Sequence, residues 1–371
     1  MNTAPPAARP AVPSSDARAD VAPVRRFRAL ALATVAIIYA LILVGGIVRA
    51  SGAGMGCPDW PMCFGQWIPP TDVSELPANY QEIYADRGYA ETEFNVVKTW
   101  TEYLNRLLGA FTGLAILATL VASVPLRRAT PAATWLSFAA FALVCVQGWL
   151  GARVVASLLA PGMITLHMLL AQVIVGLVIA AVVFAARPRI DAAAVRELPR
   201  GVGVALVALM GLGLLQLVVG TQVREAVSLV ALESEARHTW IASLPITFAI
   251  HKWYSLPLFA ANAWVAWAVM TGSRSALLRR LVVALVALMG ATIAVGLGMD
   301  RLHVPVYAQP LHLVTASLIF GVQLAILLVV RSAHAPDAVP DAPRRTVPDG
   351  RSGTSGSGAS DEPRPRLAGA S

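Results

Sequence analysis

Eight long apolar runs constrain this chain more than any other feature of its sequence. They cover approximately residues 29–48, 103–124, 133–152, 163–185, 202–223, 243–270, 281–298 and 309–330. Each is close to the roughly 20 residues that one helical crossing of a bilayer requires. Barrel strands are shorter and alternate with a period of two, which these runs do not, so helices are expected. The pattern predicts an all-α membrane protein with eight transmembrane helices.

Composition agrees with a membrane protein. Of the 371 residues, 57% are apolar and only 13% are charged, whereas soluble domains carry about 25% charge. A net charge of +8 therefore does not indicate a nucleic-acid-binding surface, and membrane lipid is the expected surrounding. The three cysteines are too few for a disulfide framework or a multi-cysteine metal cluster.

The distribution of arginine predicts how the helices are oriented. Arginines precede the first run and occur in the links between runs two and three, four and five, and six and seven. By the positive-inside rule these segments are cytoplasmic, which places both termini inside. Residues 51–100 and 225–239 then form outer loops. Residues 1–24 and 332–371, rich in small residues and proline, are predicted to be a disordered cytoplasmic arm and tail.

The amino-terminal stretch has neither the apolar core and cleavage site of a short signal peptide nor a convincing transit peptide. We therefore expect the first run to stay in the mature chain. The expected location is a bacterial inner membrane, with the chain crossing it several times.

An internal repeat divides the chain near residue 195. Leu166-His167 is followed by Ala171 and Gly176, and Leu311-His312 is followed by Ala316 and Gly321 at the same offsets. Further collinear matches pair Gly45/Arg49 with Gly220/Arg224, Gly148/Arg153 with Gly296/Arg301, and Asn105-Arg106 with His251-Lys252. Four helices return the chain to its starting side, so both copies share one topology. We expect two pseudo-symmetric four-helix bundles, residues 25–190 and 200–331, with N-in/C-in orientation.

Three histidines lie inside predicted spans, near the outer ends. His167, His251 and His312 are each about 4–8 residues from that end, or roughly 6–12 Å deep. A polar ring in hydrocarbon is costly without a partner, so such residues are functional candidates. Facing helices of a bundle can hold one iron between two imidazoles. Zinc is less attractive because no further ligand recurs at that depth. A helix–helix hydrogen bond is the structural alternative.

Four arginines lie at the predicted outer ends, on the side that the positive-inside rule depletes of cations. They are Arg49, Arg153, Arg224 and Arg301. A guanidinium binds carboxylates through a bidentate fork, so these residues could anchor the propionates of two hemes near the outer face. Snorkelling of the side chains to the interface remains the alternative.

Several motifs together resemble those of heme A synthase, the membrane enzyme that converts heme O to heme A for cytochrome oxidase. They are Gly45–Arg49, Gly56–Cys63, Glu102–Arg106, Gln147–Gly151, Thr165–His167, Gly220–Glu225, Ile250–Lys252 and Gln309–His312. They occur in the family's order over roughly residues 30–330. The resemblance implies that the C8 methyl of heme O is oxidised to a formyl group by successive hydroxylations.

The resemblance also implies a ligand set. His251 and His312 would ligate a resident heme b in the carboxy-terminal half, beside Arg224 and Arg301. His167 would ligate the substrate heme O in the amino-terminal half, beside Arg49 and Arg153. The second substrate-side histidine would fall at position 105, where this chain has Asn105. An amide is a poor iron ligand, so this site could be five-coordinate, could take water or an exogenous ligand, could use another residue, or could be less active.

Glu102 resembles the family's essential carboxylate and could take protons as the methyl is oxidised. Its structural alternative is an interfacial ion pair with Arg106 one turn on. Cys57 and Cys63 face an oxidising compartment, so a disulfide is expected. In related enzymes such a pair is proposed to relay electrons, while a purely structural bridge is the alternative. Cys145 is expected in core packing.

Two other functions compete with this interpretation. The main alternative is a b-type membrane cytochrome that only transfers electrons. A transporter ranks third, because its helices should break near the midplane, whereas most of the prolines lie near outer ends. The resemblance makes heme O synthase a possible source of the substrate. The sequence leaves the electron donor and a homo-oligomeric state open.

Overall fold

The computed structural model describes residues 21–186, 195, 198–199, 201–234 and 236–334. Most of the predicted arm 1–24 and tail 332–371 lies outside these residues. The first helix already begins at Val21, inside the range assigned to the arm. The last helix extends to His334, three residues into the range assigned to the tail.

The described chain is built from eight long helices. They are α2 (Val21–Ala50), α4 (Val96–Ser123), α5 (Pro131–Ala156), α6 (Pro161–Ala186), α7 (Gly201–Glu233), α9 (Ile246–Gly272), α10 (Ala276–Arg301) and α11 (Ala308–His334). Short helical turns occupy the connections: η1 (Val73–Glu75), α3 (Tyr80–Ile83), η2 (Ala85–Arg87), η3 (Val124–Leu126), α8 (Arg237–Trp240) and η5 (Ile241–Ser243). The prediction of an all-helical membrane protein is confirmed.

Seven of the long helices are long and apolar enough to cross a membrane, and α9 is the exception among the described residues. At 27 residues α9 has sufficient length. Polar and aromatic side chains, among them His251, Lys252 and Asn262, replace aliphatic ones along it and lower its hydropathy. Helix α9 is therefore long enough for the expected sixth crossing of the membrane, but it is less apolar than the other long helices.

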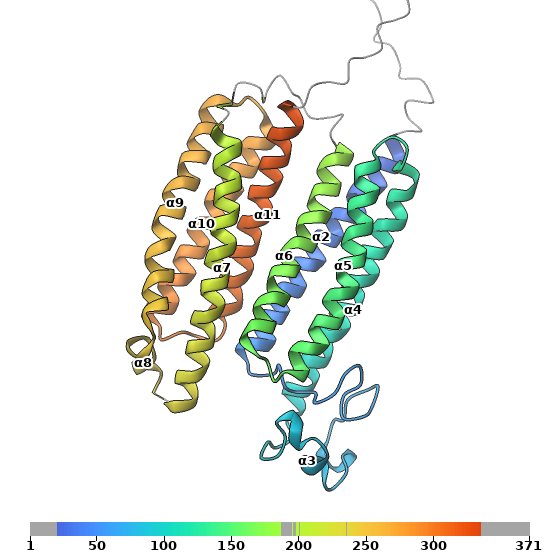
Figure 1. Cartoon of the computed structure of the whole chain (residues 1–371), viewed down its shortest axis with the longest axis vertical. Helices are drawn as coiled ribbons and strands as arrows, with labels where there is room; N and C mark the ends of the chain where they lie inside the picture. Colours follow the sequence, from blue (N-terminus) through green and yellow to red (C-terminus); the bar gives the residue numbers. More distant parts are fainter. Residues whose placement is uncertain (1–20, 187–194, 196–197, 200, 235, 335–371) are drawn as a thin grey trace, which may run out of the picture. The chain divides into compact units, whose positions relative to one another are not determined.

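Helices α2, α4, α5 and α6 pack in a ring, each against two others of the set (Figure 1). Phe27, Ile38, Ile116, Val175 and Val178 form the centre of their shared core. Helices α7, α9, α10 and α11 form a second ring. Its core contains Leu206, Val265, Leu278, Leu285 and Ile326. Large apolar side chains also cover the exposed faces of these helices, so hydropathy alone does not decide which face of a helix is buried.

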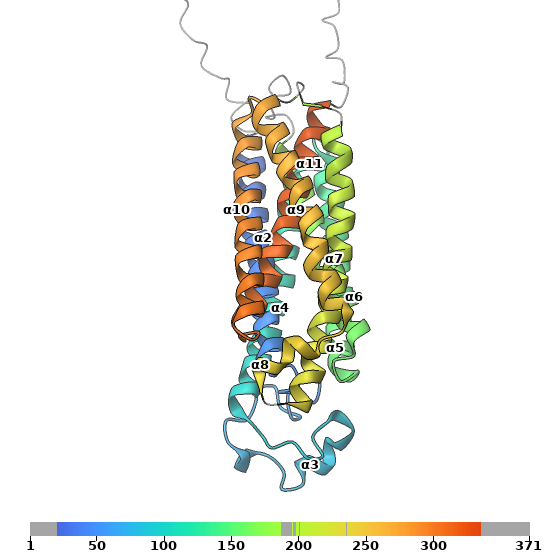
Figure 2. The same cartoon turned by 90° about the vertical axis from the view of Figure 1, so that its left-hand side faces the viewer.

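Helix α11 joins the two rings by packing against α2 and α6, and α6 also contacts α7 (Figure 2). Buried polar groups mark this seam. Gln172 Nε2 donates to Ser317 Oγ at 2.8 Å, and Tyr39 donates to the Ser317 carbonyl at 3.3 Å. A β-carbon at Gly321 would lie 2.0 Å from the Tyr39 hydroxyl, so only glycine lets these helices approach so closely.

The structure shifts both expected outer loops. Asn95 caps α4 by accepting a hydrogen bond from the Lys98 N–H at 3.0 Å, so the first loop ends at residue 95 and not at 100. Most of the expected loop 225–239 is helical, because α7 continues to Glu233 through a segment without glycine or proline. The expectation that Cys145 is buried is also wrong, since it is exposed on α5.

Candidate functional site

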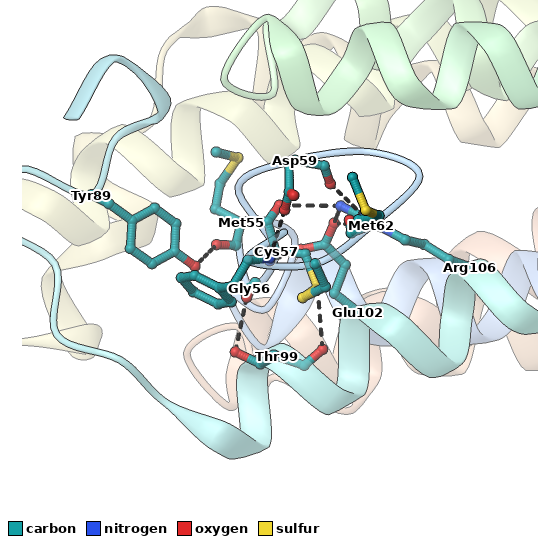
Figure 3. Close-up of polar contacts among 11 residues, drawn as sticks. Met55, Gly56, Cys57, Asp59, Met62, Tyr89, Thr99, Glu102 and Arg106 are labelled. Carbon is teal, nitrogen blue, oxygen red and sulfur yellow. Dashed lines mark hydrogen bonds and ion pairs between the residues drawn. A yellow bond between two sulfur atoms is a disulfide. The ribbon is translucent and has the colours of Figure 1, made fainter. Parts of the chain in front are cut away.

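The first loop packs directly on the start of α4 (Figure 3). A β-carbon at Gly56 would lie 2.4 Å from the Lys98 carbonyl oxygen, so glycine is required for this close approach. Cys57 and Cys63 form a disulfide, as expected, and both are fully buried. Phe64 packs its ring edge-on against four other aromatic rings of the loop, which belong to Tyr80, Tyr84, Tyr89 and Phe94. The loop therefore has its own small core.

Glu102 and Arg106 hold this loop onto α4 (Figure 3). Glu102 is 3% exposed and accepts a hydrogen bond from the Cys57 N–H at 2.9 Å. It also forms an ion pair with Arg106. The Arg106 guanidinium donates in addition to the carbonyl oxygens of Asp59 at 2.6 Å, Met62 at 3.0 Å and Cys57 at 3.1 Å. Glu102 and Arg106 therefore do form the ion pair that was considered as the structural alternative. Both residues of this pair also bind the backbone of the disulfide loop.

Two further side chains fix the loop. The Asp59 carboxylate accepts from the N–H groups of Phe64 and Gly65, both at 2.7 Å. Tyr89 donates to the Met55 carbonyl at 2.6 Å. Burial, and then the negative charge of Glu102, raise the pKa of Tyr89. Its phenol therefore stays protonated and remains a hydrogen-bond donor.

His251 of α9 and His312 of α11 face each other, with ring centroids 6.2 Å apart. His312 Nδ1 lies 3.2 Å from the Thr292 carbonyl oxygen. A carbonyl only accepts, so Nδ1 carries the proton and Nε2 is left to bind a metal. His251 Nδ1 is buried and has no hydrogen-bond partner. The structure therefore brings together the two histidines expected to share one iron.

The spacing of these two rings fits heme iron. Two imidazoles bound on opposite sides of one iron have centroids roughly 6 Å apart, because each metal–nitrogen bond is about 2 Å and each ring adds about 1 Å. The 6.2 Å separation agrees with this value. Among the described residues no group of three or more His, Cys, Asp or Glu side chains could hold a metal ion.

His167 of α6 lies against Gly151 of α5, where a β-carbon would be 3.4 Å from His167 Cε1. His312 lies against Gly296 in the same way, at 3.3 Å. Each glycine precedes its histidine by 16 residues. By contrast, a β-carbon at Gly148 would meet nothing within 4 Å. The structure therefore aligns Gly151 with Gly296, and the repeat match of Gly148 with Gly296 is shifted by three residues.

Asn105 of α4 lies opposite Gly45 of α2. A β-carbon at Gly45 would meet only Asn105 Oδ1, at 3.9 Å. This oxygen is buried and has no hydrogen-bond partner. In the second half, a β-carbon at Gly220 of α7 would lie 3.1 Å from His251 Cε1. Asn105 and His251 thus stand in matching places, as the repeat predicted.

Only two of the four outer arginines come together. Arg49 is half-buried and pairs with Glu225 at 2.7 Å. Arg224 donates to the Arg49 carbonyl at 3.2 Å and to Ser228 Oγ at 2.6 Å. Nearby, the hydroxyls of Thr165 and Thr221 are 2.8 Å apart. These contacts join α2 and α6 to α7 beside the histidines.

Arg153 and Arg301 are exposed. Arg153 follows Gly151 by two residues, which turns its side chain about 200° away from the face that contacts His167. It lines a pocket of about 330 Å³ that also includes Arg87, Trp60 and Trp149. The structure thus places Arg153 on the opposite face of α5 from His167.

A family model described as "Cytochrome oxidase assembly protein" (COX15-CtaA) matches residues 28–324. This stretch includes the six long helices from α4 to α10, most of α2 and α11, the disulfide loop and the three histidines. The chain belongs to this family.

Curated relatives of this cytochrome oxidase assembly family carry the name heme A synthase. The chain is 31% identical to the protein from Shewanella oneidensis over 35% of its own length and 36% of the relative's. It is 32% identical to the protein from Nitrosomonas eutropha, over 38% of its own length and 42% of that relative's. It is 30% identical to the protein from Rhodopseudomonas palustris, over 54% of its own length and 57% of that relative's. The matches therefore span between about a third and somewhat more than half of these relatives.

Sequence reasoning did not assign several residues that build this family member's site. Gly151, Gly220 and Gly296 appeared only as motif or repeat positions, and their contacts with imidazoles come from the packing. Glu225 appeared only as a motif residue, and its pairing with Arg49 joins positions 176 residues apart. The sequence signal that could have pointed to this ion pair is the position of Glu225 directly after Arg224, the arginine that the repeat matches with Arg49.

Proposed function

We propose that this chain is a heme A synthase, which oxidises the C8 methyl of heme O to a formyl group for cytochrome oxidase. The observation that carries the proposal is the facing pair His251 and His312 in one half, with His167 in the matching place of the other. The family match over residues 28–324 supports it. The relatives named heme A synthase support the reaction.

In this proposal all eight long helices cross a bacterial inner membrane, in two repeat-related bundles with both termini in the cytoplasm. Helix α9 is included because its charged Lys252 pairs with Asp300 at 2.6 Å, which lowers the cost of its burial. The arginines of the predicted cytoplasmic links support the orientation. Both heme sites then lie near the outer face.

His251 and His312 would hold a resident heme b. Heme b bound there would pass electrons one at a time between the reaction and an external redox partner. Thr292 orients the His312 ring through its carbonyl oxygen. Arg224 and Arg301 are proposed to contact its propionates, and the half-buried Arg224 is the better placed of the two.

His167 would ligate the substrate heme O, and Asn105 occupies the position where the repeat has the second histidine. Arg49 is proposed to bind a substrate propionate in exchange for Glu225. Arg153 could reach a propionate only from the loop side of α5. Two hydroxylations of the methyl give a geminal diol that loses water to form the aldehyde.

Glu102 is the proposed proton acceptor of this reaction. It lies at the outer end of α4, and Arg106 and the Cys57 N–H hold its carboxylate in place. The disulfide keeps the loop closed over this carboxylate. Heme O synthase is the proposed source of substrate, while the electron donor and the oligomeric state are open.

The test is co-expression with a heme O synthase, followed by heme extraction and mass spectrometry. The alcohol and aldehyde derivatives of heme O are expected. A preparation that contains low-spin heme b but neither product would instead favour an electron-transferring b-type cytochrome. If His251→Ala and His312→Ala both leave the b-type spectrum intact, the resident heme is bound elsewhere.

A further inference from the structure

Four glycines face the four repeat-related positions near the outer ends of the helices. Three of these positions hold histidine. The β-carbon distances from Gly151, Gly220 and Gly296 to the nearest imidazole carbon would be 3.4, 3.1 and 3.3 Å. These values are close to or below ordinary van der Waals contact, so each glycine forms a flat surface on which an imidazole rests.

The fourth glycine, Gly45, faces Asn105 and not a histidine. Gly45 and Gly220 each precede an arginine by four residues, and these two arginines, Arg49 and Arg224, contact each other. The two glycines therefore occupy the same level of their helices. Asn105 stands against Gly45 where His251 stands against Gly220.

Asparagine leaves space at this place. Its nearest atom is 3.9 Å from a β-carbon at Gly45, whereas the imidazole of His251 has atoms at 3.1, 3.6 and 3.9 Å from one at Gly220. The amide oxygen Oδ1 is buried and unpartnered. A buried acceptor without a partner is costly, and a small polar molecule that donates a hydrogen bond would remove this cost.

We propose that the first-half heme site provides iron with a single protein ligand, His167, and that Asn105 lines the other axial side and hydrogen-bonds a small ligand there. The ligand is water, which can donate to the unpartnered Oδ1; a diatomic gas that replaces it would instead accept from the Asn105 amide nitrogen. This inference rests on the proposed function, because it assumes that heme O binds between α4 and α6. Asn105 acts as a positioning residue for that ligand.

The chemistry of the amide supports this role. An amide oxygen is a weak ligand for heme iron, while an amide group both donates and accepts hydrogen bonds. Polar donors on the distal side of a heme decide whether small ligands are held there. In the second half, His251 and His312 face each other and would both be ligands of a bound heme, which would leave no position for a small ligand. The two halves would therefore differ in what they bind and not only in which heme they hold.

The experiment uses the full chain purified with both hemes after co-expression with a heme O synthase. Electron paramagnetic resonance of the oxidised protein and carbon monoxide binding to the reduced protein are measured. The wild type is expected to show one low-spin and one high-spin heme, and only the latter should bind carbon monoxide. His167→Ala should remove the high-spin signal and leave the low-spin signal.

Variants at position 105 sharpen the test. Asn105→His should convert the high-spin heme to low spin and abolish carbon monoxide binding, because an imidazole would rest on Gly45. Asn105→Ala should keep the heme high-spin but shift the carbon monoxide stretching frequency and speed its dissociation. A wild type with two low-spin hemes that bind no carbon monoxide would overturn the inference while leaving the proposed function standing. A chain without heme would overturn the proposed function itself.

The wild-type spectra decide the outcome even if a variant fails to fold. Unchanged spectra and carbon monoxide kinetics in both folded variants at position 105 would also overturn the inference. Gly148→Ala is the matched control for altered helix packing, since a β-carbon there would meet nothing within 4 Å.

Discussion

The carboxylate of Glu102 accepts a hydrogen bond from the backbone N–H of Cys57 at 2.9 Å. One contact thus joins the proposed proton acceptor to the disulfide loop. Because Glu102 is almost completely buried and also pairs with Arg106, its position depends on the loop as much as on its own helix. A change in either the loop or the ion pair should therefore alter the other.

Glu102→Gln should abolish heme O oxidation and destabilise the protein. The substitution removes the charge that balances Arg106, and breaking a buried ion pair costs about 3–5 kcal/mol. Product analysis and denaturant unfolding measure the two effects. Glu93→Gln, in an exposed part of the same loop, is the control and should change neither. Full activity in Glu102→Gln would exclude the carboxylate as proton acceptor.

Arg106→Ala should expose the disulfide to reductants. The guanidinium donates to three loop carbonyls, and its loss should loosen the loop over Cys57 and Cys63, which are now fully buried. We expect the rate of reduction by dithiothreitol, followed by thiol labelling, to rise about tenfold or more, which corresponds to about 1.4 kcal/mol of lost protection. Arg87→Ala, an exposed arginine of the same loop, should leave the rate unchanged.

Gly220→Ala should disturb the resident heme. The added methyl group would lie 3.1 Å from His251 Cε1, so the imidazole or the helix must move. We expect a weakened or shifted low-spin spectrum. Gly203→Ala, on the same helix with nothing within 4 Å of its β-carbon, should retain the wild-type spectrum. Identical spectra for the two variants would show that the glycine contact does not position His251.

Arg49→Ala should weaken substrate binding more than Arg153→Ala does. Arg49 is half-buried beside Arg224, whereas Arg153 is exposed on the opposite face of α5 from His167. A partly exposed charge pair contributes up to about 1 kcal/mol, or about fivefold in KM for heme O. Steady-state kinetics with both variants measure this. An equal increase in KM for the two would place both arginines at the same propionate site.

The apolar runs of the sequence predicted every long helix, because a helix that faces lipid must hide its backbone polar groups and show apolar side chains on all sides. The helix ends were less predictable. Asn95 caps the start of α4 several residues before the apolar run, and α7 continues nine residues past Arg224, beyond the expected end of its run at residue 223. These ends depend on capping and on contacts with neighbouring helices, which hydropathy does not record.

The sequence by itself determined which residues are candidates: three histidines inside predicted spans, an asparagine where the repeat has histidine, a glutamate at the edge of the second predicted span, and a cysteine pair in the first predicted loop. The tertiary structure decided which of them meet. His251 and His312 face each other, Arg49 binds Glu225 and Arg153 points elsewhere, because side-chain direction follows from helix rotation and register. A repeat of motifs allows several registers. The contacts of Gly151 with His167 and of Gly296 with His312 show which register the structure adopts, because close packing does not tolerate a shift of even one residue.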